Sequence, residues 1–272
     1  MGLFDRFGKK KTEETKKAAV QKDGQPMAMG FALLKDTYFD AEKLFHMLQR
    51  EFQGEGSVEV KPDRLLTMVA HIGDTTLRCT HMPRPVPDGE IQRRIGQNML
   101  HEKTAKALET HKSFLIISTA NQDMERRMQE CVLFNRFCAM AMKLDNAAGM
   151  YMGGSKLLVA PELYVKQVEL MKLGAEEETP YFPTELSNPI GYAINQGKKQ
   201  AFTDGMNDFG FYDFCVYHTN KDPKTLYQWL HWMSMQELLG EAVYQDGDTV
   251  DFGGGKVGTI RQREDVLQIV GV

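Results

Sequence analysis

Histidine is a common metal ligand, and a helical zinc site of the protease type needs two histidines one turn apart. His101 is followed by Glu102, but the position one turn further on is Ala105. His111 lies ten residues after His101, and this spacing does not place both rings on one ligand face. The sequence therefore predicts no metal site at these residues. The other histidines are isolated in the sequence: His46, His71, His81, His218 and His231.

A short acidic segment begins as a calcium-binding loop would. Asp246 and Asp248 are separated by Gly247. An EF-hand loop also needs a glycine at its sixth position and a glutamate at its twelfth, where this chain has Asp251 and Val257. Because Asp and Gly favour tight turns, the segment predicts a hairpin turn and not a calcium site.

Glycines beside Lys256 and Ser155 are weak signals for phosphate binding and for nucleophilic catalysis. Residues 253–255 are glycines, but the earlier glycine and the following helix of a phosphate-binding loop are missing. Ser155 follows two glycines, but the Gly-x-Ser-x-Gly turn that exposes a hydrolase nucleophile is missing as well. The sequence therefore predicts no catalytic residue, no cofactor-binding residue and no metal ligand.

The cysteines and tryptophans lie within apolar patterns, which favours a place in the core. No two cysteines form a Cys-x-x-Cys pair, so we expect reduced, buried thiols. Trp229 and Trp232, three positions apart, predict core packing, with an interface hot spot as the alternative. The four cysteines are Cys79, Cys131, Cys138 and Cys215.

The strongest structural signal lies in residues 201–251. A glycine-containing turn leads into an aromatic strand at 211–218, and a helix at 224–240 follows. Asp222-Pro223 predicts the helix start, because the aspartate can cap the free amides and proline fits the first position. Apolar residues cover most of the helix circumference. We therefore expect this strand and this helix to be partners in the core.

The remaining chain predicts an alternation of strands and helices. In the first half the order is strand, helix, two strands, helix, strand, which is the split βαβ order of ferredoxin-like sheets. The second half also offers strands around a helix. The predicted fold class is α/β (α+β), with mixed, largely antiparallel sheets, packed helices and two ferredoxin-like halves. The main expected elements are strands at 29–34, 65–72, 75–81 and 113–118, and helices at 41–52, 90–111, 123–144 and 161–173.

The first 26 residues differ from the rest in composition. Residues 1–25 hold seven Lys or Arg and four Asp or Glu, whereas the whole chain has a net charge of −4. We expect 1–26 to be a disordered basic tail that folding does not need, followed by α/β halves at 27–120 and 121–272. Leu3, Phe4 and Phe7 beside the lysines favour at most a weak peripheral contact with an anionic membrane surface.

Composition limits the partners and the compartment. The net charge argues against a dedicated nucleic-acid binder. No apolar run approaches the roughly 20 residues of a membrane span. The start of the chain lacks the apolar core of a secretory signal, so we expect a cytoplasmic protein.

Several short motifs within residues 29–263 occur together in one known family. They are Gly-Met-Tyr-Met-Gly-Gly at 149–154, Leu-Val-Ala-Pro-Glu-Leu-Tyr at 158–164, Thr-x-Gly-Met at 203–206, Asp-Gly-Asp-Thr at 246–249 and Met-Pro-x-Pro-x-Pro at 82–87. The chain therefore resembles the bacterial domain-of-unknown-function 4261 family. It departs from that family at Tyr212-Asp213, where members often carry Pro-Glu after the glycine turn. The resemblance implies an architecture but no mechanism.

Two classes of function follow from these observations. The first is a non-catalytic binding or interaction domain that binds another protein, because no complete catalytic or metal-binding set is present. The glycine turn and aromatic strand are also similar to Suppressor-of-fused-like domains, some of which neutralise bacterial toxins, and this implies an immunity or regulatory role. The alternative is a hydrolase or transferase whose residues converge only in space.

Overall fold

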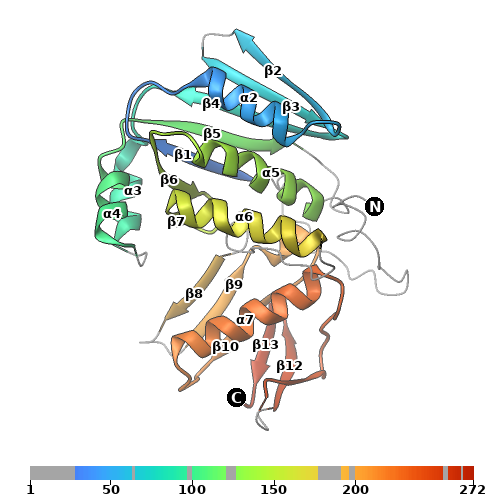
Figure 1. Cartoon of the computed structure of the whole chain (residues 1–272). Helices are drawn as coiled ribbons and strands as arrows, with labels where there is room; N and C mark the ends of the chain where they lie inside the picture. Colours follow the sequence, from blue (N-terminus) through green and yellow to red (C-terminus); the bar gives the residue numbers. More distant parts are fainter. Residues whose placement is uncertain are drawn as a thin grey trace.

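Two β-sheets with packed helices make up the part of the chain that the computed structural model describes (Figure 1). The predicted α/β fold with mixed, largely antiparallel sheets is confirmed. The predicted tail at 1–26 and the segment 254–256, which holds Lys256, lie outside the described residues. The described residues are 28–62, 65–96, 100–120, 127–176, 191–195, 200–253, 257–264 and 266–272.

The first sheet and its helices occupy the chain up to residue 176. These elements are β1 (Met29–Leu34), α2 (Ala41–Glu51), β2 (Gly56–Pro62), β3 (Leu66–Ile72), β4 (Thr75–Met82), α3 (Glu90–Ile95), α4 (Glu102–Glu109), β5 (Ser113–Ala120), α5 (Arg127–Met142), β6 (Ala147–Met152), β7 (Leu157–Val159) and α6 (Pro161–Glu176). A short 3-10 turn, Pro87–Gly89, precedes α3.

Local sequence signals account for several of these elements. Helix α2 begins where predicted, because Oδ1 of Asp40 accepts a hydrogen bond from the backbone N–H of Lys43 at 2.8 Å. Strands β3 and β4 form the predicted hairpin, and Gly73 turns it with a φ of 55°. The helical stretch expected at 90–111 is divided into α3 and α4.

The strand order of the first sheet contains a ferredoxin-like arrangement. The order is β2-β3-β4-β5-β1-β6-β7, and all neighbours are antiparallel. Within it, β1 and β4 run the same way with β5 between them, and β5 and β6 run the same way with β1 between them. Strands β2, β3 and β7 extend this arrangement at both edges.

The expected boundary between residues 120 and 121 does not coincide with the division between the sheets. Strand β6 pairs with β1 along its length, with Ala32 opposite Met150, and β7 pairs with β6. Helices α5 and α6 pack with these strands. The first sheet and its packed helices therefore extend along the chain to α6, and the first strand of the second sheet is β8.

The second sheet has the order β11-β12-β13-β10-β9-β8. Its central strands β10 and β13 are direct parallel neighbours, with Asp213 opposite Val266. The expectation of a ferredoxin-like second half is therefore wrong, because that arrangement places an antiparallel strand between two strands that run the same way. The elements are β8 (Gly191–Asn195), β9 (Gln200–Asp204), β10 (Asp213–Tyr217), α7 (Pro223–Leu238), β11 (Thr249–Asp251), β12 (Val257–Arg263) and β13 (Val266–Val270), with a 3-10 turn η4 (Met206–Phe209).

Helix α5 lies at the centre of the molecule. All its residues except Met128 and Gln129 are buried, because α2, α6, the first sheet and η4 of the second half surround it. One core cluster extends from α5 into the second sheet, where it includes Phe214 of β10 and Leu230 of α7, the predicted core partners. Helices α2, α5 and α6 lie along one side of the first sheet (Figure 1).

The opposite face of the first sheet is covered by α3 and α4. Leu33, Phe114 and Tyr151 point to that face and pack with Ile91 of α3 and Leu108 of α4. Because both faces of the central strands are covered, the strands are apolar on both sides. Helix α6 covers α5 from outside and presents its own outer face to solvent.

Candidate functional site

The histidines that the sequence singled out serve local structure. Nδ1 of His101 accepts a hydrogen bond from the backbone N–H of Lys103 at 3.3 Å and so caps α4. Beyond the other end of α4, Nε2 of His111 accepts one from the backbone N–H of Val86 at 2.9 Å. Burial lowers the pKa of His111, against a hydrogen bond to the carbonyl of Leu108. Within the described ranges, no group of three His, Cys, Asp or Glu side chains could hold a metal ion.

The acidic turn before β11 uses its carboxylates to hold the backbone. Oδ1 of Asp246 accepts a hydrogen bond from the backbone N–H of Gln262 at 2.8 Å, and Oδ2 of Asp248 accepts one from that of Gln245 at 2.7 Å. Ser155 lies half-buried in the turn between β6 and β7. All four cysteines are free and buried, as predicted.

The two tryptophans of α7 have different surroundings. Trp229 is 8% exposed and stacks on Phe252, with 4.2 Å between ring centroids. Trp232 is 42% exposed and meets the same ring edge-on. The prediction of core packing is therefore confirmed for Trp229, whereas Trp232 reaches the surface.

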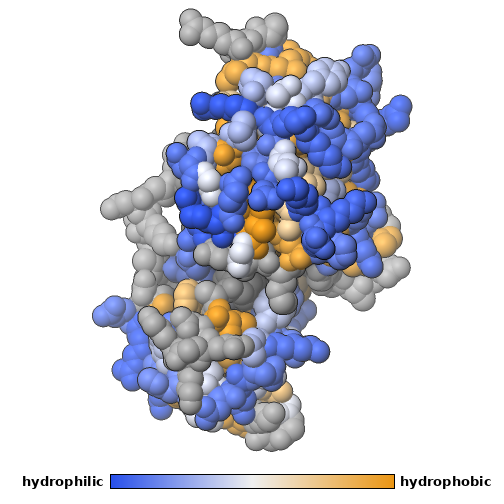
Figure 2. Space-filling view, turned by 90° about the vertical axis from the view of Figure 1, so that its left-hand side faces the viewer, coloured by the Kyte–Doolittle hydropathy of each residue, from blue (hydrophilic) through white to orange (hydrophobic). Residues whose placement is uncertain are grey.

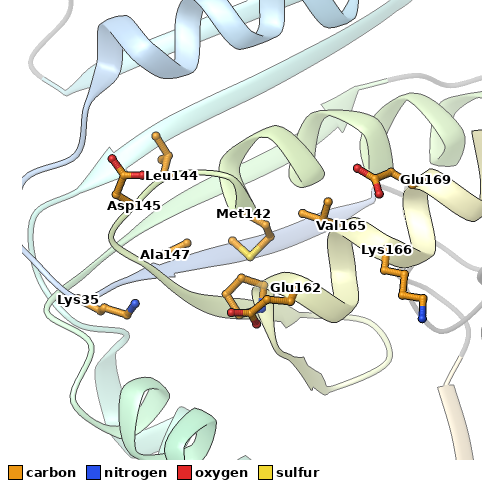
Figure 3. Close-up of a pocket in the computed structure, with 10 residues that line it drawn as sticks. Lys35, Met142, Leu144, Asp145, Ala147, Glu162, Val165, Lys166 and Glu169 are labelled. Carbon is orange, nitrogen blue, oxygen red and sulfur yellow. The ribbon is translucent and has the colours of Figure 1, made fainter.

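An open hollow of about 410 Å³ lies between the end of α5 and the start of α6 (Figure 3). Its floor is apolar and its rim carries charges of both signs. Figure 3 shows that the charged groups stand around the floor at a distance from one another, so they do not form a catalytic cluster. The floor residues are Met142, Leu144, Ala147, Pro161 and Val165, and the rim residues are Lys35, Asp145, Glu162, Lys166 and Glu169.

A row of leucines continues this surface along α6. Leu163 is 50% exposed, Leu170 42% and Leu173 49%, although the helix already buries a separate apolar line on α5. Most of the molecular surface in Figure 2 is hydrophilic, and hydrophobic residues reach it only in small areas. We call the exposed side of the helix the α6 face, and it consists of Glu162, Leu163, Lys166, Glu169, Leu170 and Leu173.

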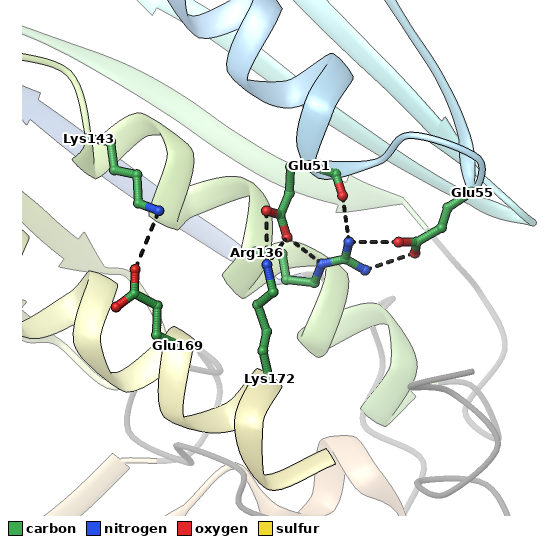
Figure 4. Close-up of polar contacts among 6 residues, drawn as sticks. All are labelled: Glu51, Glu55, Arg136, Lys143, Glu169 and Lys172. Carbon is green, nitrogen blue, oxygen red and sulfur yellow. Dashed lines mark hydrogen bonds and ion pairs between the residues drawn. The ribbon is translucent and has the colours of Figure 1, made fainter. Parts of the chain in front are cut away.

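The charges on the α6 face are only partly used within the chain. Glu169 pairs with Lys143, the residue that follows α5, at 3.5 Å (Figure 4). Across the hollow, Asp145 pairs with Lys43 at 2.9 Å. The side chains of Glu162 and Lys166 have no hydrogen-bond or ion-pair partner among the residues that the structure describes.

A partly buried ion network connects α6 to α2 and α5 (Figure 4). Lys172 of α6 donates hydrogen bonds to both carboxylate oxygens of Glu51 at 3.0 Å, and Arg136 of α5 binds Glu51 and Glu55. Burial by itself lowers the pKa of Arg136, but the hydrogen bonds to Glu55 and Glu51 outweigh it, so the pKa is raised above its ordinary value. The guanidinium therefore stays charged, and Glu51 of α2 joins the three helices because it binds both Arg136 of α5 and Lys172 of α6.

Two further carboxylates with shifted pKa values have structural partners. Glu90 accepts hydrogen bonds from Arg93, Tyr151 and Arg94, each at 2.7 Å, and these bonds hold its pKa at about 2. Burial raises the pKa of Asp213, which accepts hydrogen bonds within the turn between β9 and β10. Each group is held in a local network, so neither provides a free catalytic base.

Comparison with known proteins finds no matching family model, no matching curated protein and no matching solved structure. No described helix combines the length and the apolar character needed to cross a lipid bilayer. The candidate site therefore depends on the geometry of this chain alone. The sequence predicted a helix at 161–173, but which of its leucines are exposed depends on where α5 lies.

Proposed function

We propose that this chain is a non-catalytic protein-binding domain, and that its binding surface is the α6 face with the adjoining hollow. The observation that supports this is the row of Leu163, Leu170 and Leu173, each about half exposed on one side of a single helix. Scattered exposed leucines are ordinary, but an apolar row on one helix is typical of a face that another protein covers.

The surroundings of the leucines favour a protein over a small molecule. The hollow is open, and its charged groups ring the floor instead of converging on a point. Interfaces combine an apolar centre with a polar rim, and charges of both signs on the rim select among partners. The α6 face has this composition, with Glu162, Lys166 and Glu169 beside the leucines.

Three statements from the sequence stay predictions. The chain is expected to be a bacterial, cytoplasmic protein, to belong to the domain-of-unknown-function 4261 family, and to have an immunity or regulatory role. A contact of the basic tail with a membrane surface also stays a prediction. The alternative, a hydrolase or transferase, needs ionisable groups that converge in a pocket. No described group supports it, since Glu90 and Asp213 are held in structural networks.

Site-specific photo-crosslinking tests the proposal. A photoreactive residue replaces Glu162 on the α6 face, and the control replaces Glu102, which is exposed on α4. We expect a discrete crosslinked protein from position 162 in cells of the native host and none from position 102. The captured protein, once purified, should bind wild type at least about tenfold more tightly than it binds Leu170→Ser. It should bind wild type and Leu65→Ser with equal affinity. Equal crosslinking at both positions, or none at either, would contradict the proposal.

A further inference from the structure

The α6 face has a pattern that is complementary to itself. Leu163, Leu170 and Leu173 are separated by seven and three positions, the spacing of a helix–helix seam. Lys166 and Glu169 lie between the outer leucines and carry opposite charges. We infer that the partner of this face is a second copy of this chain, bound with the two α6 helices antiparallel about a two-fold axis. This inference rests on the proposed function, because it names the protein that the α6 face binds.

Antiparallel pairing brings apolar residues of the two copies together. When the helices cross level with Val168, midway along the row, Leu163 of one copy lies at the height of Leu173 of the other. Each leucine at one end of the row then packs beside a leucine of the opposite end, and Leu170 lies near the centre of the contact. A two-fold axis allows this because both copies use the same patch.

The charges favour the antiparallel arrangement over the parallel one. At 1.5 Å of rise per residue, Lys166 of one copy lies within about 2 Å, along the helix axis, of Glu169 of the other. These two side chains also lie on the same side of the seam, because the two-fold axis reverses the direction of the helix without exchanging the two sides of the seam. A parallel pair would instead bring Lys166 against Lys166, and like charges at one level are destabilising. Lys166, which has no side-chain partner among the described residues, gains one in the antiparallel pair.

The size of the contact predicts a reversible dimer. From Leu163 to Leu173 the helix rises about 15 Å. A contact between two such rows and their neighbours is smaller than the roughly 800 Å² per partner of a standard interface. We therefore expect a dimer that forms at micromolar concentrations and dissociates on dilution.

Sedimentation equilibrium over a concentration series tests the inference with the full chain. We expect Leu170→Ser to weaken dimerisation at least about tenfold, and Leu65→Ser, a matched change at an exposed leucine outside α6, to leave it unchanged. Circular dichroism melting of both variants shows whether they fold as wild type does.

Charge reversal tests the antiparallel register. Lys166→Glu and Glu169→Lys should each weaken the dimer about tenfold, because each creates a like-charge contact across the seam. The double variant should restore the wild-type dissociation constant to within about threefold. A double variant that is weaker than either single variant would overturn the register.

The outcomes separate this inference from the proposed function. A wild-type chain that is monomeric up to about millimolar concentration overturns the dimer. If crosslinking at position 162 then captures a different protein, the binding function stands and only the identity of the partner is wrong. If position 162 captures nothing, both are wrong.

Discussion

Arg136 of α5 donates a hydrogen bond from Nε to Oε1 of Glu51 of α2 at 2.7 Å, and both side chains are almost completely buried. The two residues are 85 positions apart in the sequence. Arg136 also lies over the ring of Phe52, 4.8 Å from its centroid. The attraction within a buried charge pair is largely offset by the hydration that both charges lose on folding. The pair therefore affects stability mainly when one partner is removed and the other charge stays buried.

Replacing Arg136 by methionine should therefore destabilise the protein strongly. Arg136→Met removes the hydrogen bonds of the guanidinium to Glu51 and Glu55 and leaves Lys172 as the remaining described partner of the Glu51 carboxylate, which costs about 1.5–3 kcal/mol of unfolding free energy. Urea unfolding measures this. The control is Lys61→Met, which removes a partner of Glu59 in an exposed pair and should cost less than about 1 kcal/mol. If both variants lose the same amount, the buried network does not stabilise the helix packing.

The carboxylate of Glu90 predicts a pH-dependent contribution to stability. Hydrogen bonds from Arg93, Tyr151 and Arg94 lower its pKa from 4.5 to about 2 in the folded chain. A carboxyl whose folded pKa is depressed contributes stability above its unfolded pKa, and this contribution is lost as pH falls through the folded pKa. The contribution is therefore complete above about pH 5 and disappears toward pH 2.

We expect Glu90→Gln to lower the melting temperature by about 1–4 °C at pH 7. The difference from wild type should shrink steadily below about pH 5, because Glu90 becomes protonated in the unfolded chain while it stays ionised in the folded chain until about pH 2. Thermal melts from pH 7 to pH 3 measure it. Glu102→Gln, at an exposed glutamate in the first turn of α4, should show a small difference at neutral pH. A Glu90→Gln difference that stays constant with pH would contradict the assignment.

Gly56 is required where β2 begins. A Cβ at this position would overlap the backbone carbonyl of His71 and lie 2.9 Å from Cα of Ile72, both on β3. Backbone atoms cannot move aside as the end of a side chain can, so Gly56→Ala should cost about 1–3 kcal/mol. Gly96→Ala is the matched control. A Cβ there would make only an ordinary contact, 3.9 Å from the backbone oxygen of Arg93, and the backbone is helical, so we expect no loss.

The elements that the sequence predicts well are those with local signals. The hairpin at Gly73 follows from turn chemistry, and the starts of α2 and α7 follow from Asp40 and Asp222-Pro223. Strand pairing between distant segments has no such signal. Nothing in residues 147–152 indicates that β6 pairs with β1, and nothing in 266–270 indicates a parallel pairing with β10. For this reason the division between the sheets and the second ferredoxin-like half were not predicted correctly.

The candidate site was missed for a related physical reason. Leu163, Leu170 and Leu173 look in sequence like part of the core line of a helix. Their exposure follows from the position of α5, which already takes Tyr164, Val168 and Met171 of α6 into the core. A usable signal was present, because α6 carries more apolar residues than one buried face needs. The ion network could not be predicted, since Glu51 of α2 binds Arg136 of α5 and Lys172 of α6, which lie far apart in the sequence.

Asp213 holds the glycine turn that connects β9 to β10. Its carboxylate accepts hydrogen bonds from the Thr203 hydroxyl at 2.8 Å, the Asn207 amide at 3.0 Å, and the backbone N–H groups of Met206 at 3.1 Å and Gly205 at 3.3 Å. The Thr203 hydroxyl in turn accepts from the backbone N–H of Phe214 at 2.9 Å. One buried side chain therefore satisfies several donors that water does not reach.

Asp213→Ala should cost about 2–4 kcal/mol of unfolding free energy, because it leaves buried donors without acceptors. Asp251→Ala is the control, since exposed Asp251 accepts one turn hydrogen bond from Gly253 at 2.8 Å and should cost less than about 1 kcal/mol. Hydrogen exchange locates the effect. We expect faster exchange at residues 203–214 in Asp213→Ala, with unchanged protection in α2. Uniformly faster exchange in both regions would show that Asp213 supports the whole fold and not this turn.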